Sequence, residues 1–508
     1  MDTVSRIARR AQWLVLFALA LFFGFPVLSI AAEFLRPSQF IDTLTDSSLR
    51  DVWWFTTWQA VLSTILTLLV GLPFTWAISR RPFRFSQGIA RFITIPFLMP
   101  AVVVATGVKA ILPNVEVPAI LWAHVVFNVA VVVRVVGPTW SMLDTTLEDT
   151  AADLGAGRVR TFFLVVLPHI RTSLRNASAI VFLFCFTSFA VVAILGGISH
   201  RTIESEIFTQ TVRLGDLRTA TSLALLQAIV VLLVLRIGGS ARVDTDEPLT
   251  LQSINTRSTP SFGVWVSALI PLVIVVAPLA AVVIRSFTLN GHFSFNGYRW
   301  LFDGSTKAFG INMTRTIATS LVFASMCAGL ATLAALIICA ARNRSTFIAS
   351  LTALPLVVSA VTLGLGLIIT FDESPINWRS QWWLIPVVHT VIAVPLALRT
   401  LQPAVSAIPA DLYEASASLG ANPWRTWARV ELPLIRPALL RAAGFSAAVS
   451  LGEFGATSFL SRSDTTTIPI AIGQLLGRPG DVPSQSAFAL ASLVAIVIAL
   501  APQVRRNK

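Results

Sequence analysis

Apolar runs about as long as a membrane is thick recur along this chain and constrain its fold more than any other feature. The hydrocarbon core of a bilayer is roughly 30 Å thick, and a helix crosses it in about 20 residues. Lipid offers no partner to free backbone groups, so such runs must form helices. We therefore expect an all-α polytopic membrane protein with about twelve transmembrane helices, near residues 12–32, 54–78, 92–112, 117–137, 177–198, 219–238, 263–284, 316–340, 348–371, 382–402, 438–460 and 485–503.

The composition agrees with a membrane protein and excludes other classes. Charged residues make up 12% of the 508 residues, whereas soluble globular proteins carry about 25%. The formal net charge of +13 reflects arginines at the ends of the apolar runs, so nucleic-acid binding is not indicated. No metal site, disulfide framework or other cofactor is expected, because the three cysteines lie in apolar runs without ligand spacing: Cys185, Cys327 and Cys339.

Arginine gathers in alternate connections between the runs, which predicts the orientation of the chain. The connections between these basic ones are balanced or acidic, and basic loops stay in the cytoplasm. We therefore predict a multi-pass protein with both termini cytoplasmic. The first run, residues 11–32, is too long for a cleaved signal peptide and reads as the first helix. The basic positions are Arg6, Arg9, Arg10, Arg80, Arg81, Arg84, Arg91, Arg342, Arg344, Arg505, Arg506 and Lys508.

A polar stretch separates the sixth run from the seventh. Its sequence, GGSARVDTDEPLTLQSINTRSTPS, is rich in Ser, Thr, Asp and Pro and has no helical apolar face. We interpret residues 239–262 as a flexible cytoplasmic linker. It divides the chain into a first six-span half, residues 1–238, and a second, residues 263–508.

A polar segment occurs twice, at an offset of 265 residues. LEDTAADLGAGRVRTFFLVVLPHIR (147–171) aligns with LYEASASLGANPWRTWARVELPLIR (412–436), and 12 of these 25 positions are identical. Because each copy lies in a six-span half, and six is even, both halves have the same topology. We predict two parallel halves related by a pseudo-twofold axis along the membrane normal. The same offset also pairs Arg134 with Arg399, Pro138 with Pro403, His124 with His389 and Phe189 with Phe454.

The repeated segment has the local signals of two short helices joined by a tight turn. Helix formers with Glu414 in the first turn precede Gly420, which favours a left-handed helix end. Asn422 can cap a second helix that starts at Pro423, and two later prolines are expected to end it, Pro433 and Pro437. Such a unit is either a docking element at the cytoplasmic face or an amphipathic loop that only anchors itself to the membrane.

EASASLGANPWRTWARVELP resembles the EAA loop of ABC importer permeases. In that family the loop, here about 403–440 and 138–175, holds a coupling helix that docks into an ATPase subunit. The resemblance assigns this role to Glu414, Ala415, Gly420, Leu432 and Pro433 in the second copy. The first copy keeps Gly155, Leu167 and Pro168, but has Asp149 in place of the glutamate and Thr150 in place of the first alanine. Its docking contact is therefore expected to be the weaker one.

The resemblance extends over the whole chain and implies a function. Two fused six-span halves, with FTSFAVVAILGG and SLGEFGATSFL after the loops, are similar to the permeases of thiamine and ferric-iron importers. It implies a subunit of the bacterial inner membrane that passes a small solute such as thiamine or ferric iron. Its expected partners are two ATPase subunits, as a homodimer, and an external substrate-binding protein. The chain has no GxxxxGK[ST] motif, so ATP hydrolysis is expected in separate subunits and not in this chain.

Polar residues inside apolar runs are costly and therefore candidates for the translocation path. His124 and His389 occupy equivalent positions and face each other across the predicted axis, or else each bonds a neighbouring helix in its own half. Glu453 lies in the eleventh run, with Ser188 at the equivalent position. It lines the path or pairs locally, and the sequence leaves both readings open.

An ion-gradient-driven secondary transporter with two six-span repeats is the alternative function. It explains the twelve runs and the repeat equally well. It does not explain the duplicated polar loop, nor why Glu453 is nearly the only carboxylate within the runs.

Overall fold

The computed structural model describes most of the chain. It covers residues 2–33, 43, 46–80, 83, 86–197, 199–238, 261–342, 345–356, 358–372 and 377–500. The expected linker lies outside the described residues except for 261–262, and so do six of the orientation residues: Arg81, Arg84, Arg344, Arg505, Arg506 and Lys508.

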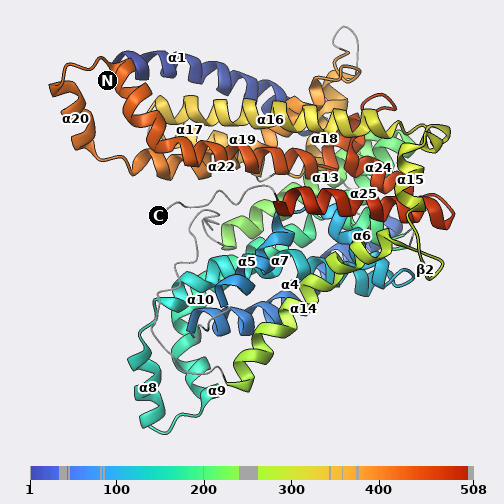
Figure 1. The fold of residues 1–508 in the computed structure, drawn as a ribbon, viewed down its shortest axis with the longest axis horizontal. Coiled ribbons are helices and arrows are strands. Elements are labelled where there is room, and N and C mark those ends of the chain that lie inside the picture. Colours follow the sequence, from blue (N-terminus) through green and yellow to red (C-terminus); the bar gives the residue numbers. More distant parts are fainter. Residues whose placement is uncertain are drawn as a thin grey trace.

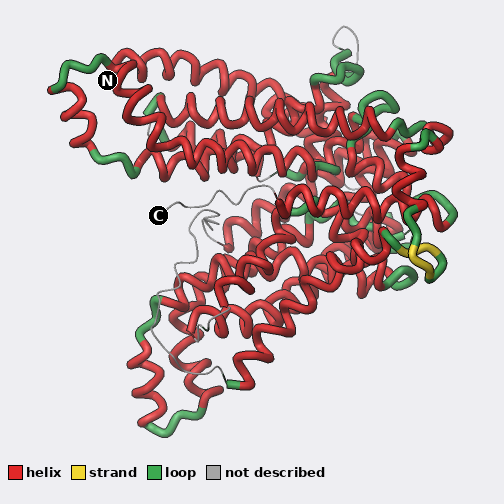
Figure 2. Tube along the Cα trace, in the orientation of Figure 1, coloured by secondary structure: helices red, strands yellow, loops and turns green. Residues whose placement is uncertain are grey.

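The described residues are almost entirely helical, as expected (Figure 2). The earlier part of the chain forms α1 (Asp2–Leu19), η1 (Ala20–Gly24), α2 (Phe25–Glu33), α4 (Ser47–Arg80), α5 (Ser86–Leu98), α6 (Ala101–Ile111), α7 (Glu116–Ser141), α8 (Thr145–Asp153), α9 (Arg158–Thr161), η2 (Phe162–Val166), α10 (Leu167–Phe186), α11 (Ala190–Leu195), α12 (Ile203–Phe208), η3 (Thr209–Leu214) and α13 (Leu217–Gly238). The elements η1, η2 and η3 are π-helical turns.

The later part begins with a long helix and contains one small hairpin. Its elements are α14 (Phe262–Ser286), β1 (Thr288–Leu289), β2 (His292–Phe293), α15 (Asn296–Phe302), η4 (Ser305–Phe309), α16 (Met313–Ala340), α17 (Thr346–Ala353), η5 (Leu354–Leu356), α18 (Ala360–Phe371), α19 (Leu384–Ser406), α20 (Ala410–Ser418), α21 (Pro423–Thr426), η6 (Trp427–Glu431), α22 (Leu432–Gly452), α23 (Gly455–Leu460), α24 (Ile468–Leu476) and α25 (Asp481–Leu500). β1 and β2 pair antiparallel; η4 and η5 are 3₁₀ turns and η6 is a π-helical turn.

Nine helical segments among the described residues are long and apolar enough to cross a membrane, and a bent pair makes ten. The pair, Phe347–Leu356 with Ala360–Phe371, turns by 99°. The count is lower than the twelve expected, because the broken runs near 92–112 and 177–198 contain no helix that is both long and apolar enough. The run near 92–112 breaks at Pro100, which has no backbone N–H and disfavours helix at the residue before it. The run near 177–198 breaks between α10 and α11.

Several elements recur at the sequence offset of 265 residues. The bounds of α8, α9, η2 and α11 match those of α20, α21, η6 and α23 residue for residue. The packing recurs as well, since α4, α7 and α10 contact one another as α16, α19 and α22 do. The repeat seen in the sequence is therefore also a repeat of local structure, and the axis relating the copies stays a prediction.

The first helix of each sequence half packs against the other half. Helix α1 lies along α16 and contacts α17 and α21, while α2 packs on α18. Conversely, α14 packs against α4, α5, α6 and α7. A division of the chain at residues 239–262 thus separates each first helix from most of the helices that cover it.

The helices form two arms that meet at one end and diverge towards the other (Figure 1). The tip of one arm carries α8 and α9, and the tip of the other carries α20. The N-terminal end of α1 lies near the α20 tip, whereas α24, α25 and α6 lie where the arms meet. The repeated loops are therefore at the same, diverging end of the molecule.

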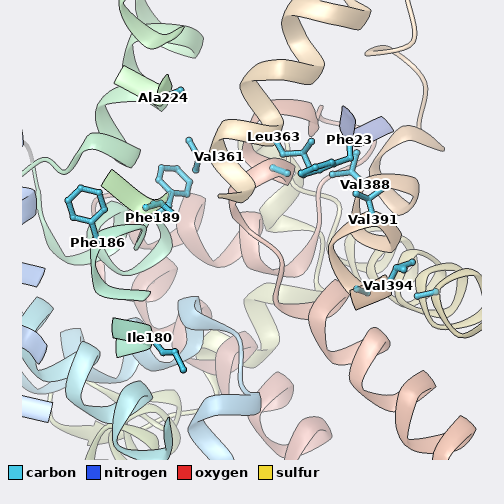
Figure 3. Packing of buried hydrophobic residues seen from close by; sticks show 14 of the residues in the cluster. Phe23, Ile180, Phe186, Phe189, Ala224, Val361, Leu363, Val388, Val391 and Val394 are labelled. Carbon is cyan, nitrogen blue, oxygen red and sulfur yellow. The ribbon is translucent and has the colours of Figure 1, made fainter. Parts of the chain in front are cut away.

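Buried and half-buried aromatic rings join the two halves where the arms meet. Phe189 and Phe454, which are equivalent at the 265 offset, stack with ring centroids 5.5 Å apart. Phe208 extends this contact: its ring is tilted against Phe189, with centroids 5.4 Å apart, and meets Phe459 edge-on, also with centroids 5.4 Å apart. The same hydrophobic cluster holds residues of both halves, among them Phe186 and Val361 (Figure 3). Burial of such large rings stabilises the contact between the arms by the hydrophobic effect.

Cross-linking at the two ends of the arms tests this arrangement. In a variant without Cys185, Cys327 and Cys339, and with a protease site inserted in residues 239–262, a short bis-thiol reagent is expected to join Phe189→Cys to Phe454→Cys. The rings of these residues touch, so the cleaved halves should migrate as one band. Leu154→Cys with Leu419→Cys is the control, because these equivalent residues lie on different arm tips. Linking of the control pair alone would contradict the arrangement.

Candidate functional site

The two repeated loops adopt matching helix–turn–helix conformations. Helices α8 and α20 each end before a glycine in the left-handed region, Gly155 with φ of 81° and Gly420 with φ of 74°. In the second copy, the side chain of Asn422 accepts a hydrogen bond from the Arg425 N–H at 2.8 Å, and Pro423 is the first residue of α21. The local prediction of a short helix, a glycine turn and a capped second helix is confirmed.

The prediction that prolines end the second helix was wrong. Residues Pro423–Gly452 form one continuous helical segment of 30 residues. Pro433 lies in the first turn of α22, directly after the π-helical turn η6, and Pro437 lies inside the helix. A proline lacks one backbone N–H donor. The wider π-helical turn changes which N–H groups the helix needs for its hydrogen bonds, so the helix continues past the prolines. Pro168 follows η2 in the same way in the first copy.

The residues assigned by the resemblance have the same exposure in both copies. Asp149 and Glu414 are exposed at equivalent positions, and Gly155, Ala415 and Gly420 are exposed as well. Leu167 and Leu432 are half-buried, whereas Pro168 and Pro433 are exposed. The loops thus present equivalent faces, with their acidic positions open to a partner.

Exposed leucines stand at the turn of both loops and were not selected by the sequence reasoning. Leu154 is 83% exposed and Leu419 is 87% exposed. They are identical at the 265 offset and directly precede the two glycines, which is the signal that could have found them. Nearby apolar side chains are also exposed, including Val159, Phe163 and Trp424. An apolar patch at an arm tip is a feature of a protein-binding surface.

The two copies begin differently. Asp144 caps α8, accepting a hydrogen bond from the Thr146 N–H at 2.9 Å. This backbone hydrogen bond lowers the pKa of the Asp144 carboxyl from its ordinary value. The equivalent residue before α20 is Pro409, which has no side-chain cap.

His389 and Glu453 belong to one buried polar cluster. The Nδ1 of His389 lies 2.7 Å from Ser450 Oγ, and its Nε2 lies 2.9 Å from Thr457 Oγ1 and 3.5 Å from Glu453 Oε2. Glu453 accepts the backbone N–H groups of Ala456 and Thr457, both at 2.8 Å, and the Thr457 hydroxyl donates to it. The carboxylate therefore caps α23 at the break after α22. The structure thus brings together two of the four candidate path residues.

His124 lies in a different environment despite its equivalent position. Its Nδ1 is 3.0 Å from Ser63 Oγ on α4, and its buried Nε2 has no hydrogen-bond partner among the described residues. The positions equivalent to Ser450, Glu453 and Thr457 hold Cys185, Ser188 and Val192. Ser188 lies in the break between α10 and α11. In this conformation both histidines are bonded within their own half, not across the predicted axis.

Helices α12 and α24 also match at the 265 offset, and both are packed into the protein. Ile203, Glu204 and Ile207 of α12 are buried, as are Ile468 and Ile472 of α24. Glu204 accepts hydrogen bonds from Gln227 at 2.7 Å and from Ser359, the residue before α18, at 3.2 Å.

Known proteins match the sequence of this chain over most of its length. No family model matches it. The thiamine transport system permease protein ThiP of Brucella abortus is 27% identical over 465 residues, which cover 85% of this chain and 83% of ThiP. ThiP of Salmonella typhimurium is 24% identical over 477 residues, covering 85% and 84%. The chain is thus similar to ABC importer permeases over most of its length.

A third relative matches only part of the permease. PhnV of Salmonella typhimurium, a candidate 2-aminoethylphosphonate transport system permease protein, is 31% identical over 153 residues. These cover 30% of this chain and 57% of PhnV.

This similarity agrees with the expectation that ATP is hydrolysed in separate subunits and not in this chain. Permeases of this kind are not catalytic themselves, and they work with ATPase subunits and a binding protein. The permease is a multi-pass membrane protein, and its own sequence holds the repeated segment twice.

Removal of the Glu453 carboxylate is expected to destabilise the permease. Glu453→Ala leaves the N–H groups of Ala456 and Thr457 without their acceptor, at a cost of about 1–3 kcal/mol. Thermal unfolding in detergent measures the loss. Glu453→Gln, which keeps one acceptor oxygen, should lose less, and Ser188→Ala at the equivalent position should be nearly neutral. The assignment fails if the alanine variants at 453 and 188 are equally stable.

Proposed function

We propose that this permease is the membrane subunit of an ATP-driven thiamine importer, with its two repeated loops docked on two ATPase subunits. The observation that supports this role most directly is the matched geometry of the loops. Each has a short helix, a left-handed glycine and an exposed leucine, at the tip of its own arm. Two equivalent docking surfaces fit two equivalent ATPase subunits, that is, a homodimer.

The shape of the molecule supports a mechanism by alternating access. The arms diverge at the loop-bearing end and meet at the other end, where Phe189 and Phe454 stack. Closure of the ATPase dimer would bring the arm tips together and separate the aromatic contact, opening the path on the opposite side. We place the loop-bearing end in the cytoplasm because of the arginine distribution. The substrate-binding protein then docks at the end where the arms meet.

The path residues remain candidates within this mechanism. His389 and Glu453 form one cluster near Phe454, whereas His124 and Ser188 occupy the equivalent places in the other half. Opening of the aromatic contact would bring water to this region, and Glu453 would then favour a cationic solute.

Thiamine is the proposed solute because the relatives that span most of the chain are named as thiamine permeases. A phosphonate such as 2-aminoethylphosphonate is the second candidate, supported by the shorter match to PhnV. Ferric iron, implied by the resemblance of the sequence, is the third.

Variants of the loops test the docking role. Gly420→Ala meets no atom within 4 Å, so its effect comes from the left-handed backbone, which costs a non-glycine residue about 1–2 kcal/mol. Combined with Glu414→Ala, it is expected to weaken co-purification of the ATPase subunit about tenfold. Asp149→Ala should have a smaller effect, because the first loop already has the shorter acid.

Gly444→Ala is the matched control, since it also meets no atom within 4 Å and lies inside α22. It should retain the ATPase. Retention of the ATPase by the loop variants would contradict the docking role. Uptake that persists without ATP but needs a proton gradient would favour the secondary transporter instead.

Reconstitution tests the substrate. Proteoliposomes that hold the permease, its ATPase and the binding protein are expected to accumulate radiolabelled thiamine only with internal ATP and external binding protein. Unlabelled thiamine should compete, and 2-aminoethylphosphonate and ferric iron should not. If only the phosphonate competed, the transported solute would be a phosphonate and not thiamine, while the assignment as an importer would stand.

A further inference from the structure

The first repeated loop is tied to the end of α4 by a buried arginine. Arg80, the last residue of α4, has a side chain only 5% exposed. Its guanidinium donates to Glu148 Oε1 at 2.7 Å and to the Leu143 carbonyl at 2.6 Å. Leu143 precedes α8, and Glu148 lies in the first turn of that helix. One side chain therefore holds both the entry to the coupling helix and its first turn.

The second loop is tied to the end of α16 by different chemistry. The Arg342 guanidinium carbon lies 4.5 Å from the centroid of the Tyr413 ring of α20. The same arginine donates to Glu431 Oε2 at 3.1 Å, and the Glu431 side chain is 7% exposed. A cation over an aromatic face thus connects the end of α16 to α20, and a partly buried ion pair connects it to η6.

The backbone around Arg342 is also held in an uncommon shape. Its φ is 49°, in the left-handed region that non-glycine residues seldom adopt. From α1, Arg9 Nε donates to the Ala341 carbonyl at 3.3 Å. This backbone conformation and the hydrogen bond from α1 together hold the end of α16 in the orientation that places Arg342 over Tyr413.

The two anchored residues are the same position of the repeat. Glu148 and Tyr413 are separated by 265 residues, and each directly precedes the acidic position of its loop, Asp149 or Glu414. The arginines are not equivalent, because Ser345 and Ala77 stand at the corresponding positions. In each half, the same position of the loop is thus held by an arginine, but the two arginines stand at non-equivalent positions.

We propose that Arg80 and Arg342 are positioning residues that make each coupling helix move with its arm. This inference rests on the proposed docking of the ATPase on the loops. An ATPase can bind a loose loop, but closure of the ATPase then moves the loop without moving the arm. The anchors therefore act on the coupling of hydrolysis to transport and not on ATPase binding.

The test compares transport with hydrolysis in proteoliposomes that contain the permease, ATPase and binding protein. Arg80→Gln and Glu148→Gln should each raise the ATP hydrolysed per solute imported by at least about threefold, the effect of losing a modest coupling energy. Co-purification of the ATPase should stay within about twofold of the unmodified complex. The exchange Arg80→Glu with Glu148→Arg should recover part of the coupling.

At the second anchor, Tyr413 contributes an aromatic face to the Arg342 cation and carries no charge itself. Tyr413→Phe should therefore keep the coupling ratio, whereas Tyr413→Leu should raise it as Arg80→Gln does. Arg175→Gln, which removes an exposed arginine of α10 on the same arm as Arg80, is the control and should leave the ratio unchanged.

The outcomes separate the two proposals. Unchanged coupling in Arg80→Gln and Tyr413→Leu, with the ATPase bound, overturns the anchoring role and leaves the docking role standing. Loss of ATPase binding in both variants overturns it too, because the arginines would then belong to the docking surface. If Gly420→Ala with Glu414→Ala retains the ATPase, the docking role itself fails.

Discussion

The absence of hydrogen-bond partners in lipid is the constraint on which this structure depends. It makes every apolar run helical, and it allows a helix to break only where another group satisfies the freed backbone. The breaks follow this rule. Glu453 accepts two N–H groups at the start of α23, and the Ser359 side chain accepts the Thr362 N–H at 3.0 Å at the start of α18. Where prolines follow the loops, a π-helical turn carries the helix through.

The two copies of the repeat agree in the bounds of their loop helices but differ in their polar residues. The helix–turn–helix loops have the same bounds residue for residue at the 265 offset. The polar residues changed instead. His389 keeps three polar neighbours while His124 has one, because serine, glutamate and threonine in one half are cysteine, serine and valine in the other. The anchors at Glu148 and Tyr413 diverged in the same way.

The exchange of first helices links the two halves through helix packing. Helix α1 lies on α16 and supports its end through Arg9, while α14 covers the helices of the other half. Each arm therefore contains helices from both halves, and a force applied at either loop would be transmitted to both. Under the proposed mechanism, this arrangement would let the two arms move as rigid units about the aromatic contact of Phe189 and Phe454.

The sequence by itself determined the helical class, the places of most spans, the repeat and the shape of the loops. These follow from local physics: the length of an apolar run, a glycine that tolerates positive φ, and an asparagine that caps the next helix. Local signals also misled, since Pro433 and Pro437 predicted a helix end that the π turn removed. Only the tertiary structure decided that Glu453 lies 3.5 Å from His389, that Arg80 holds Glu148, and that α1 crosses to the other half. Such partners are far apart along the chain, and no local pattern specifies them, because which side chains meet depends on how all the helices pack together.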